Sequence, residues 1–251
     1  MAISFSLEGK AALVTGANTG IGQAIAVALA QAGADVAVAG RSEPADTLAL
    51  IAETGRKAVN IRADLSSIEP CPRVIDEALA GLGRIDVLVN NAGIIRRDDL
   101  LNFTEADWDA VMDTNLKTLF FLSQAAARHM TTRGSGKIIN IASLLTFQGG
   151  IRVPSYAAAK SGVGGVTKAM ANELAPKGVQ VNAIAPGYIS TNNTAALQAD
   201  ETRNRQILER IPTGRWGAPD DIAGAAVFLA SPASDYVTGH VLAVDGGWLA
   251  R

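Results

Sequence analysis

The stretch Thr15-Gly16-Ala17-Asn18-Thr19-Gly20-Ile21-Gly22 decides the fold, because it joins a short apolar run, Ala11–Val14, to an amphipathic segment that begins at Gly20. A glycine-rich turn between a strand and a helix is typical of a dinucleotide phosphate loop. Gly16 allows the tight turn, Gly20 lets the backbone approach a pyrophosphate, and Gly22 allows close helix packing. No Gly-Lys-Ser/Thr follows, which excludes a Walker-type loop. A plain strand-to-helix turn is the alternative interpretation.

Outward from this loop, short apolar runs alternate with longer helical patterns along the whole chain. This order predicts one α/β domain over residues 1–251, with a Rossmann-like, doubly wound, parallel seven-stranded sheet. The predicted strands are Ala11–Val14, Val36–Ala39, Val59–Ala63, Val87–Val89, Ile138–Ile141, Val181–Ile184 and Leu242–Val244. The predicted helices are Gly20–Ala32, Ala45–Thr54, Arg73–Leu82, Glu105–Met130, Tyr156–Ala175 and Pro219–Ala230. The polar segment Gly187–Pro212 follows a strand at the edge where ligands enter such sheets, which predicts a mobile substrate lid.

The composition limits the class of partner. The 251 residues are 48% hydrophobic, enough for a large core, and the net charge of −2 offers no basic footprint for nucleic acid or an anionic membrane. The single Cys71 rules out an internal disulfide and fits a reducing compartment. Neither a signal-peptide pattern nor a membrane-length apolar stretch appears. We therefore expect a cytoplasmic protein with small-molecule ligands.

Tyr156 and Lys160 lie one helical turn apart, with Ser143 upstream at the predicted end of a strand. Residues at i and i+4 are stacked on a helix, so the Lys160 ammonium should favour the ionised Tyr156 phenol and lower its pKa from about 10. The Ser143 hydroxyl could then hydrogen-bond the carbonyl or alkoxide oxygen that Tyr156 protonates or deprotonates. A solvated helix face with a packed tyrosine fits the pair equally well, unless a redox cofactor binds beside it.

Further motifs supply such a cofactor site. Asn90-Asn91-Ala92-Gly93 follows the fourth predicted strand, Asn115 follows it in the chain, and Pro186-Gly187 ends the sixth strand. With the glycine-rich loop and the Ser143, Tyr156 and Lys160 trio, these motifs resemble the short-chain dehydrogenase/reductase family over the full chain. The resemblance implies that Asn115, Ser143, Tyr156 and Lys160 are catalytic, with Asn115 holding a water that links Lys160 to solvent. The predicted cofactor-binding residues are Gly16, Asn18, Thr19, Gly20, Ile21, Gly22, Arg41, Asp64, Leu65, Asn91, Ala92, Gly93, Tyr156, Lys160, Pro186, Gly187, Ile189 and Thr191.

The residue after the second predicted strand sets the choice of nicotinamide cofactor. A carboxylate there binds the ribose 2′-hydroxyl of NAD(H), whereas an arginine accommodates the 2′-phosphate of NADP(H). Gly40 takes the place of the acid and Arg41 follows it, so the sequence favours NADP(H). NAD(H) or dual use stays open, because Asn18 and Thr19 are not basic and Arg41 could be a surface or adenine-stacking residue.

Longer strings resemble the branch of this family that acts on sugar acids. They are Asn91–Arg97, Phe147–Tyr156, Ala185–Thr194, Arg210–Gly217 and Val244–Arg251. An acid substrate agrees with Arg96, Arg97 and Arg152, because all three lie in loops predicted at the edge near Tyr156, where a guanidinium can bind a carboxylate. The predicted substrate-binding residues are Arg96, Ser143, Arg152 and Tyr156, with Arg152 or Arg96 as the carboxylate partner.

Two alternative functions stay open. One keeps the chemistry but takes a 3-oxoacyl group, a polyol or a hydrophobic ketone, and the other is a nucleotide-binding protein without turnover. The polar lid and the arginines argue against a hydrophobic substrate. His129 and His240 lack partners at metal-ligand spacing, so no metal site is predicted. The resemblance implies a homotetramer, with Glu105–Met130, Tyr156–Ala175 and the tail Asp245–Arg251 in its interfaces.

Overall fold

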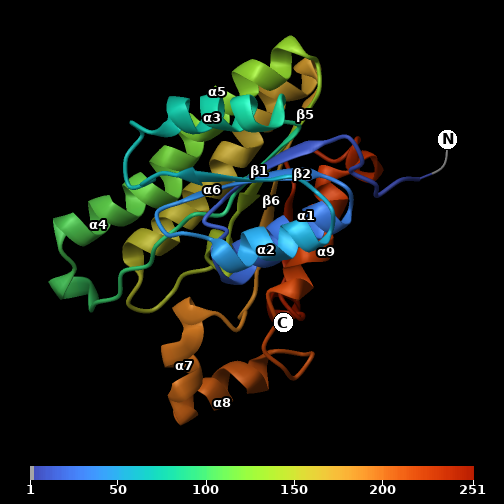
Figure 1. Ribbon diagram of the computed structural model, residues 1–251. Coiled ribbons are helices and arrows are strands. Elements are labelled where there is room, and N and C mark those ends of the chain that lie inside the picture. Colours follow the sequence, from blue (N-terminus) through green and yellow to red (C-terminus); the bar gives the residue numbers. More distant parts are fainter. Residues whose placement is uncertain (1–2) are drawn as a thin grey trace.

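All seven predicted strands form and pair in parallel in one sheet of order β3-β2-β1-β4-β5-β6-β7 (Figure 1). The structure, a computed structural model, describes residues 3–251. The strands are β1 (Ala11–Thr15), β2 (Asp35–Gly40), β3 (Ala58–Arg62), β4 (Val87–Asn90), β5 (Gly136–Ile141), β6 (Val179–Pro186) and β7 (Val241–Val244). Central strands β1, β4 and β5 are buried along their whole length, because helices cover both faces of a parallel sheet.

Helices cover the sheet on both faces, which confirms the predicted doubly wound fold. On one face lie α1 (Gly20–Gln31), α2 (Ala45–Glu53) and α9 (Asp220–Ala230), with a core that includes Ile25, Ile51 and Ile222. On the other lie α3 (Cys71–Leu82), α5 (Thr118–Thr132) and α6 (Pro154–Leu174), with Val74, Leu122 and Met170 in the core. In Figure 1, α3 and α5 lie above the sheet, and α1, α2 and α9 lie below it.

The prediction of one uninterrupted α-helix over Glu105–Met130 is wrong. The structure divides it into α4 (Glu105–Met112), a π-helical turn η2 (Asp113–Lys117) and α5. In η2 the Thr118 amide donates to the Asp113 carbonyl, five residues back. π-turns are rare and recur at functional sites. The hydrophobic pattern gave no sign of this turn, which holds Asn115.

The predicted lid, residues 187–212, is largely helical. It contains a short 3₁₀ turn η5 (Asn192–Thr194), α7 (Ala195–Ala199) and α8 (Glu201–Arg210). Asp200 caps α8 by accepting hydrogen bonds from the amides of Thr202 and Arg203. In Figure 1 α7 and α8 project from the sheet on the side where the chain ends. The segment therefore consists mainly of short helices, and its role as a mobile lid stays a prediction.

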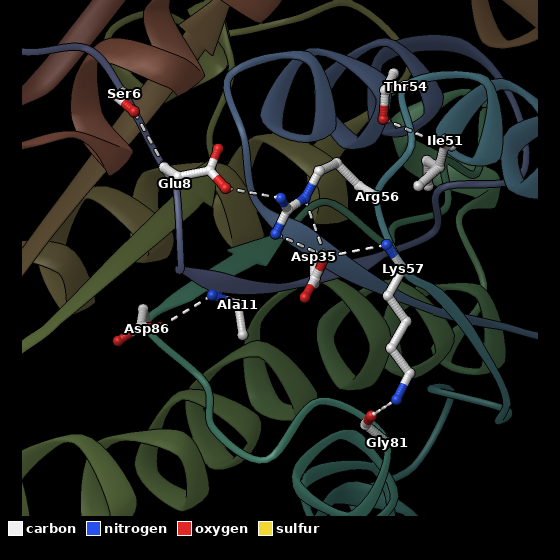
Figure 2. Close-up of polar contacts among 10 residues, drawn as sticks. All are labelled: Ser6, Glu8, Ala11, Asp35, Ile51, Thr54, Arg56, Lys57, Gly81 and Asp86. Carbon is white, nitrogen blue, oxygen red and sulfur yellow. Dashed lines mark hydrogen bonds and ion pairs between the residues drawn. The ribbon is translucent and has the colours of Figure 1, made fainter.

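The amino end of the sheet is closed by polar contacts (Figure 2). Arg56 bridges Glu8 and Asp35, with N–O distances of 3.0 Å and 3.1 Å. The Ala11 amide, at the start of β1, donates to the Asp86 carboxylate at 2.9 Å. These contacts connect the N-terminal ends of the strands. The loops at the C-terminal ends of the strands therefore remain available to form a site.

Two features are absent from residues 3–251. None of the helices in this range combines the length and the apolar character that crossing a bilayer requires. Within the same range, no three His, Cys, Asp or Glu side chains lie close enough together to hold a metal ion.

Candidate active site

The glycine-rich loop has the conformation that a phosphate-binding turn needs. Gly16 and Gly20 have φ angles of +62° and +61°, a region that residues with a side chain rarely adopt. The Asn91 Nδ2 donates to the carbonyls of Thr15 and Gly16, at 3.0 Å and 2.8 Å. A Cβ on Gly22 would come within 2.3 Å of both Asn91 Nδ2 and the Gly16 oxygen. The side chain that follows β4 therefore holds the loop against the start of α1.

A groove of about 510 Å³ runs along the carboxyl edge of the sheet from β2 and β3 to β4 and the lid. Most predicted cofactor-binding residues line it: Gly16, Asn18, Thr19, Gly20, Ile21, Gly22, Arg41, Asp64, Leu65, Asn91, Ala92, Gly93 and Thr191. Predicted residues Gly187 and Ile189 line a separate cavity of about 200 Å³ behind the lid, and Pro186 ends β6. Neither Tyr156 nor Lys160 is among the residues that line the groove.

Several groove residues were not predicted. They are Gly40, Ser42, Ala63, Ser66, Ile94, Ala110, Thr114, Asn192 and Asn193. Most of them are next to a predicted residue in the sequence, so only this proximity could have indicated them. Ala110 and Asn193 are the exceptions: Ala110 reaches the groove from α4, where no sequence motif marks it, and Asn193 lies two residues beyond the predicted Thr191.

The groove fits an extended dinucleotide. The loop glycines have no side chain, so a ligand can approach their backbone. If Gly20 had a Cβ, the nearest atom to it would belong to the Thr191 side chain, at 3.5 Å. Arg41 and Ser42 line the far end, and Asp64 is the one carboxylate in the lining. The Asp64 carboxylate already accepts a hydrogen bond from the Ser66 amide. The groove therefore suits a phosphate-bearing ligand, and its own cation, Arg41, lies at one end.

Ser143, Tyr156 and Lys160 come together at the carboxyl ends of β5 and β6. Ser143 caps the 3₁₀ turn η3 (Leu144–Thr146), where its Oγ accepts from the Leu145 amide at 3.2 Å. Because that contact uses an acceptor lone pair, the hydroxyl proton of Ser143 is available to another oxygen. The buried Lys160 Nζ donates to the Ile141 carbonyl at 2.6 Å and lies 5.5 Å from the centre of the Tyr156 ring.

Burial changes the acidity of both titratable groups in this trio. Burial raises the pKa of Tyr156, against a hydrogen bond from Ser143 and the charge of Arg97, which both lower it. Burial also lowers the pKa of Lys160 to about 8. The predicted lowering of the Tyr156 pKa by Lys160 is therefore wrong for the protein alone, because desolvation of the phenol outweighs its charged and polar neighbours.

Asn115 braces the loop that follows β4. Its Oδ1 accepts from the Ile94 amide and its Nδ2 donates to the Ile94 carbonyl, both at 2.8 Å. The side chain is 1% exposed, so these two bonds satisfy a buried amide. They also hold η2 beside Gly93 and Ile94 at the end of the groove. The water-holding role that the family resemblance implies for Asn115 stays a prediction.

Acidic neighbours pair with two of the three arginines near this site. Arg96 lines the groove and pairs with Asp107, with an Nε–O distance of 3.1 Å. Arg152 pairs with Asp99 at 3.0 Å and has a φ of +64°, which is unusual for a residue with a side chain. Both guanidinium groups therefore already have a carboxylate partner.

Arg97 differs from its two neighbours. Its Nη2 donates to the carbonyl of Asn193 in the lid at 3.0 Å, and its charge acts on the Tyr156 phenol. No carboxylate pairs with Arg97 among the described residues 3–251. Arg97 therefore bonds to the predicted lid segment and acts on the Tyr156 phenol through its charge, whereas the sequence predictions assigned the substrate carboxylate to Arg96 or Arg152.

Comparisons with known proteins agree with this geometry. The family described as enoyl-(acyl carrier protein) reductase matches residues 16–249. The 2-dehydro-3-deoxy-D-gluconate 5-dehydrogenase of Escherichia coli strain K12 is 59% identical over 249 residues, covering 99% of this chain and 98% of the relative.

Solved structures are similar over the whole chain. An Agrobacterium tumefaciens protein with bound NADP is 61% identical, with a TM-score of 0.93 and full coverage of both chains. A gluconate 5-dehydrogenase from Burkholderia cenocepacia, in complex with NADP and tartrate, is 42% identical, with a TM-score of 0.95 and coverage of 99% of this chain and 98% of that one. With this similarity over the full length, the chain belongs to the short-chain dehydrogenase/reductase family.

Proposed function

We propose that the protein interconverts a ketone and a secondary alcohol on a sugar acid of the 2-dehydro-3-deoxy-D-gluconate type, with NADP(H) as the preferred cofactor. The observation that carries this proposal is that Arg97 bonds to a backbone carbonyl of the predicted lid and acts on Tyr156 through its charge, while carboxylates pair with Arg96 and Arg152. A cation there suits a substrate with a carboxylate and a reacting oxygen in the same small molecule. The sugar-acid dehydrogenase of Escherichia coli, 59% identical over nearly the full chain, supports the same substrate class.

The residues that would hold NADP(H) come from four loops and the lid. The glycine-rich loop and the start of α1 would bind the pyrophosphate, and Arg41 with Ser42 would bind the 2′-phosphate. Asp64 and Leu65 would border the adenine. Asn91, Ala92, Gly93 and Thr191 would lead toward the nicotinamide end, beside Lys160. When bound, the nicotinamide ring accepts or donates the hydride.

The chain itself handles the proton and the orientation of the substrate. In the reducing direction the Tyr156 hydroxyl gives its proton to the carbonyl oxygen, and in the oxidising direction the phenolate takes the proton of the alcohol. Ser143 would donate a hydrogen bond to the same oxygen in place of the one it gives to Tyr156 in the protein alone, since its cap uses only an acceptor lone pair. Lys160, whose Nζ lies 5.5 Å from the centre of the Tyr156 ring, would hold the nicotinamide ribose beside the phenol.

Arg97 replaces Arg96 and Arg152 as the proposed partner of the substrate carboxylate. Ion pairs with Asp107 and Asp99 occupy those two arginines, whereas Arg97 donates to the Asn193 carbonyl and forms no ion pair among residues 3–251. The Burkholderia cenocepacia relative binds tartrate, a small hydroxy acid with two carboxylates, in its complex. That ligand supports an anion-binding site of this kind in the family branch.

The proposal is tested with purified protein, NADPH and a panel of 5-keto and 3-keto sugar acids. We expect a loss of nicotinamide absorbance with at least one acid of the 2,5-diketo-3-deoxygluconate or ketogluconate type. The matching neutral ketose serves as the control and should react much more slowly. No turnover across the acid panel would overturn the substrate class.

The family description makes an acyl thioester the second candidate substrate. A 3-oxoacyl or enoyl thioester in the same assay decides between the two candidates. The polar side chains of Arg96, Asn192 and Asn193 in the groove lining favour the sugar acid. Binding of NADPH without turnover of either class would instead indicate a nucleotide-binding protein.

A homotetramer in the cytoplasm completes the proposal. Large apolar side chains lie exposed near the substrate end, with Leu101 at 96% and Ile151 at 81% exposure, which favours their burial against another chain. Sedimentation velocity should give four times the mass of one chain. A monomeric mass at micromolar concentration would contradict the proposed assembly.

A further inference from the structure

Trp248, three residues before Arg251, is buried under the lid. Its side chain is 5% exposed and belongs to an apolar cluster, named here the tail cluster. The buried members are Leu144, Ile207, Ile211 and Trp248, against which Tyr188, Leu197, Trp216 and Leu249 pack. Ile207 lies on α8 of the lid, and Leu144 directly follows Ser143. The tail cluster therefore joins the lid to the turn that carries Ser143.

Polar contacts fix the tail in this position. The Asp245 carboxylate accepts from the Leu249 amide at 2.9 Å, which folds the tail into a turn. The Arg251 Nε donates to the carbonyl of Arg210 at 3.2 Å, at the end of α8. The Arg210 guanidinium lies 4.0 Å from the centre of the Trp248 ring, within the range of a cation–π contact. The tail and α8 are thus held together as one unit.

Trp248 holds the turn η3 at both ends. Leu144, the first residue of η3, shares the tail cluster with Trp248. The indole Nε1 of Trp248 donates to the Oε1 of Gln148, just beyond the other end of η3, at 3.2 Å. Ser143 is the N-cap of this same turn, so any shift of η3 moves the Ser143 hydroxyl.

The opposite side of η3 rests on α6, the helix of Tyr156 and Lys160. The Thr146 hydroxyl donates to the Lys160 carbonyl at 2.9 Å, and the Ser161 hydroxyl donates to the Leu145 carbonyl at 3.1 Å. These bonds hold Leu145 and Thr146, while Leu144 and the following Gln148 contact the tail cluster. The distance between Ser143 and Tyr156 therefore depends on both contacts.

We propose that Trp248 is a positioning residue: through the tail cluster it couples the seating of the lid to the placement of the Ser143 hydroxyl. The inference rests on the proposed function, because it concerns the same reacting oxygen. Its consequence is that the lid affects the proton-transfer step as well as substrate binding. A shift of Ser143 by about 1 Å would be enough to slow that step substantially.

The test compares the pH dependence of kcat for alcohol oxidation in wild-type and Trp248→Ala enzyme. Ser143 helps to hold the pKa of Tyr156 down, so displacing Ser143 should move the apparent pKa of the profile to higher pH. We expect that shift together with a loss of kcat of about tenfold. Trp248→Phe keeps a ring in the cluster and should restore most of kcat. The Kd for NADPH should stay within about twofold of wild type, since Trp248 lies outside the groove lining.

Trp216→Ala is the matched control. Trp216 also packs on Tyr188, with ring centres 5.5 Å apart, and bonds to Asn204 of α8, but it makes no hydrogen bond to η3 among the described residues. This variant should raise KM for the acid and keep the wild-type apparent pKa, because it loosens the lid without moving Ser143.

Two results would overturn the inference: a wild-type apparent pKa in Trp248→Ala, whatever its kcat, or the same shift in Trp216→Ala. If circular dichroism shows that Trp248→Ala does not fold, Trp248→Leu takes its place under the same criteria. Turnover of sugar acids by the wild type decides the proposed function separately. If only another alcohol reacts, the same profiles measured with that alcohol still decide the role of Trp248.

Discussion

The role of each side chain in the site depends on which of its donors and acceptors can still bond to a substrate. Ser143 uses a lone pair for its cap, which leaves its proton for Tyr156 in the protein alone and for the reacting oxygen when substrate binds. Replacing Tyr156 by Phe removes only the proton donor. We expect kcat to fall by at least about 10²-fold, the usual size of a general acid–base contribution, with NADPH affinity preserved. Steady-state kinetics and fluorescence titration measure the two quantities, and a variant that kept half its activity would contradict the assignment.

The buried amine of Lys160 predicts a pH dependence of stability. Its pKa falls from 10.5 in the unfolded chain to about 8 in the folded one, so near pH 9 the unfolded state binds the proton and the folded state releases it. Stability then rises with pH through this window. Relative to Lys160→Met, the free energy of unfolding of the wild type should increase by about 1 kcal/mol between pH 7 and pH 9.

Urea unfolding of the two proteins at both pH values measures this difference. Other groups that titrate in the same range cancel in the comparison, because the two proteins share them. A pH-independent difference between wild type and Lys160→Met would show that burial does not shift the Lys160 pKa.

Removal of the charge should have one outcome at Arg97 and another at both Arg96 and Arg152. Arg97→Met should raise KM for the sugar acid by about 10- to 100-fold, since a hydrogen bond between charged groups contributes about 1.5–3 kcal/mol. Arg96→Met and Arg152→Met should change KM by less than about threefold, because exposed ion pairs contribute little. A larger increase in KM on replacing Arg96 or Arg152 than on replacing Arg97 would instead support Arg96 or Arg152 as the carboxylate partner, as the sequence predicted.

At the scale of elements, the junction between β1, α1 and β4 is the tightest point of the cofactor site. Gly22→Ala would push a methyl group against Asn91 Nδ2 and the Gly16 carbonyl. We expect NADPH affinity to fall at least about tenfold and the free energy of unfolding to fall by about 1–3 kcal/mol, as for other overpacked sites. Gly224→Ala in α9 meets no atom within 4 Å and should stabilise the helix slightly. Isothermal titration and urea unfolding test both variants, and unchanged NADPH binding by Gly22→Ala would contradict the close approach.

Elements that follow from local pattern were predictable, and those that follow from tertiary contacts were not. Alternating apolar runs and glycine punctuation predicted all seven strands to within a few residues. The π-turn η2 was missed because two hydrogen bonds between Asn115 and Ile94, far apart in the chain, accompany it. The sequence did not favour Arg97 as the carboxylate partner for a similar reason. Only the folded structure shows that Asp107 pairs with Arg96 and that Asp99 pairs with Arg152.

At the scale of the whole molecule, the two edges of the sheet have different tasks. Ion pairs such as Arg56 with Glu8 and Asp35 tie the amino edge together, as Figure 2 shows. The carboxyl edge opens at the point where the strand order reverses between β1 and β4, the place where doubly wound sheets bind ligands. Loops after β1, β2, β3 and β4 and the lid all line one groove, so a ligand there contacts most of the fold.

Because the groove spans so much of the fold, cofactor binding should appear as a change in global stability. NADPH at a hundred times its Kd should stabilise the folded state by about 2.7 kcal/mol, which raises Tm by roughly 5–10 °C in a chain of this size. Arg41→Ala should lose more than half of the shift produced by NADPH and keep the shift produced by NADH, because only the 2′-phosphate needs the guanidinium. Arg62→Ala is the control, since Arg62 lies opposite Gly40 in the sheet but outside the groove lining, and both shifts should stay as in wild type. A larger Tm shift with NADH than with NADPH in the wild type, each at the same concentration, would reverse the proposed cofactor preference and make Arg41 a surface residue.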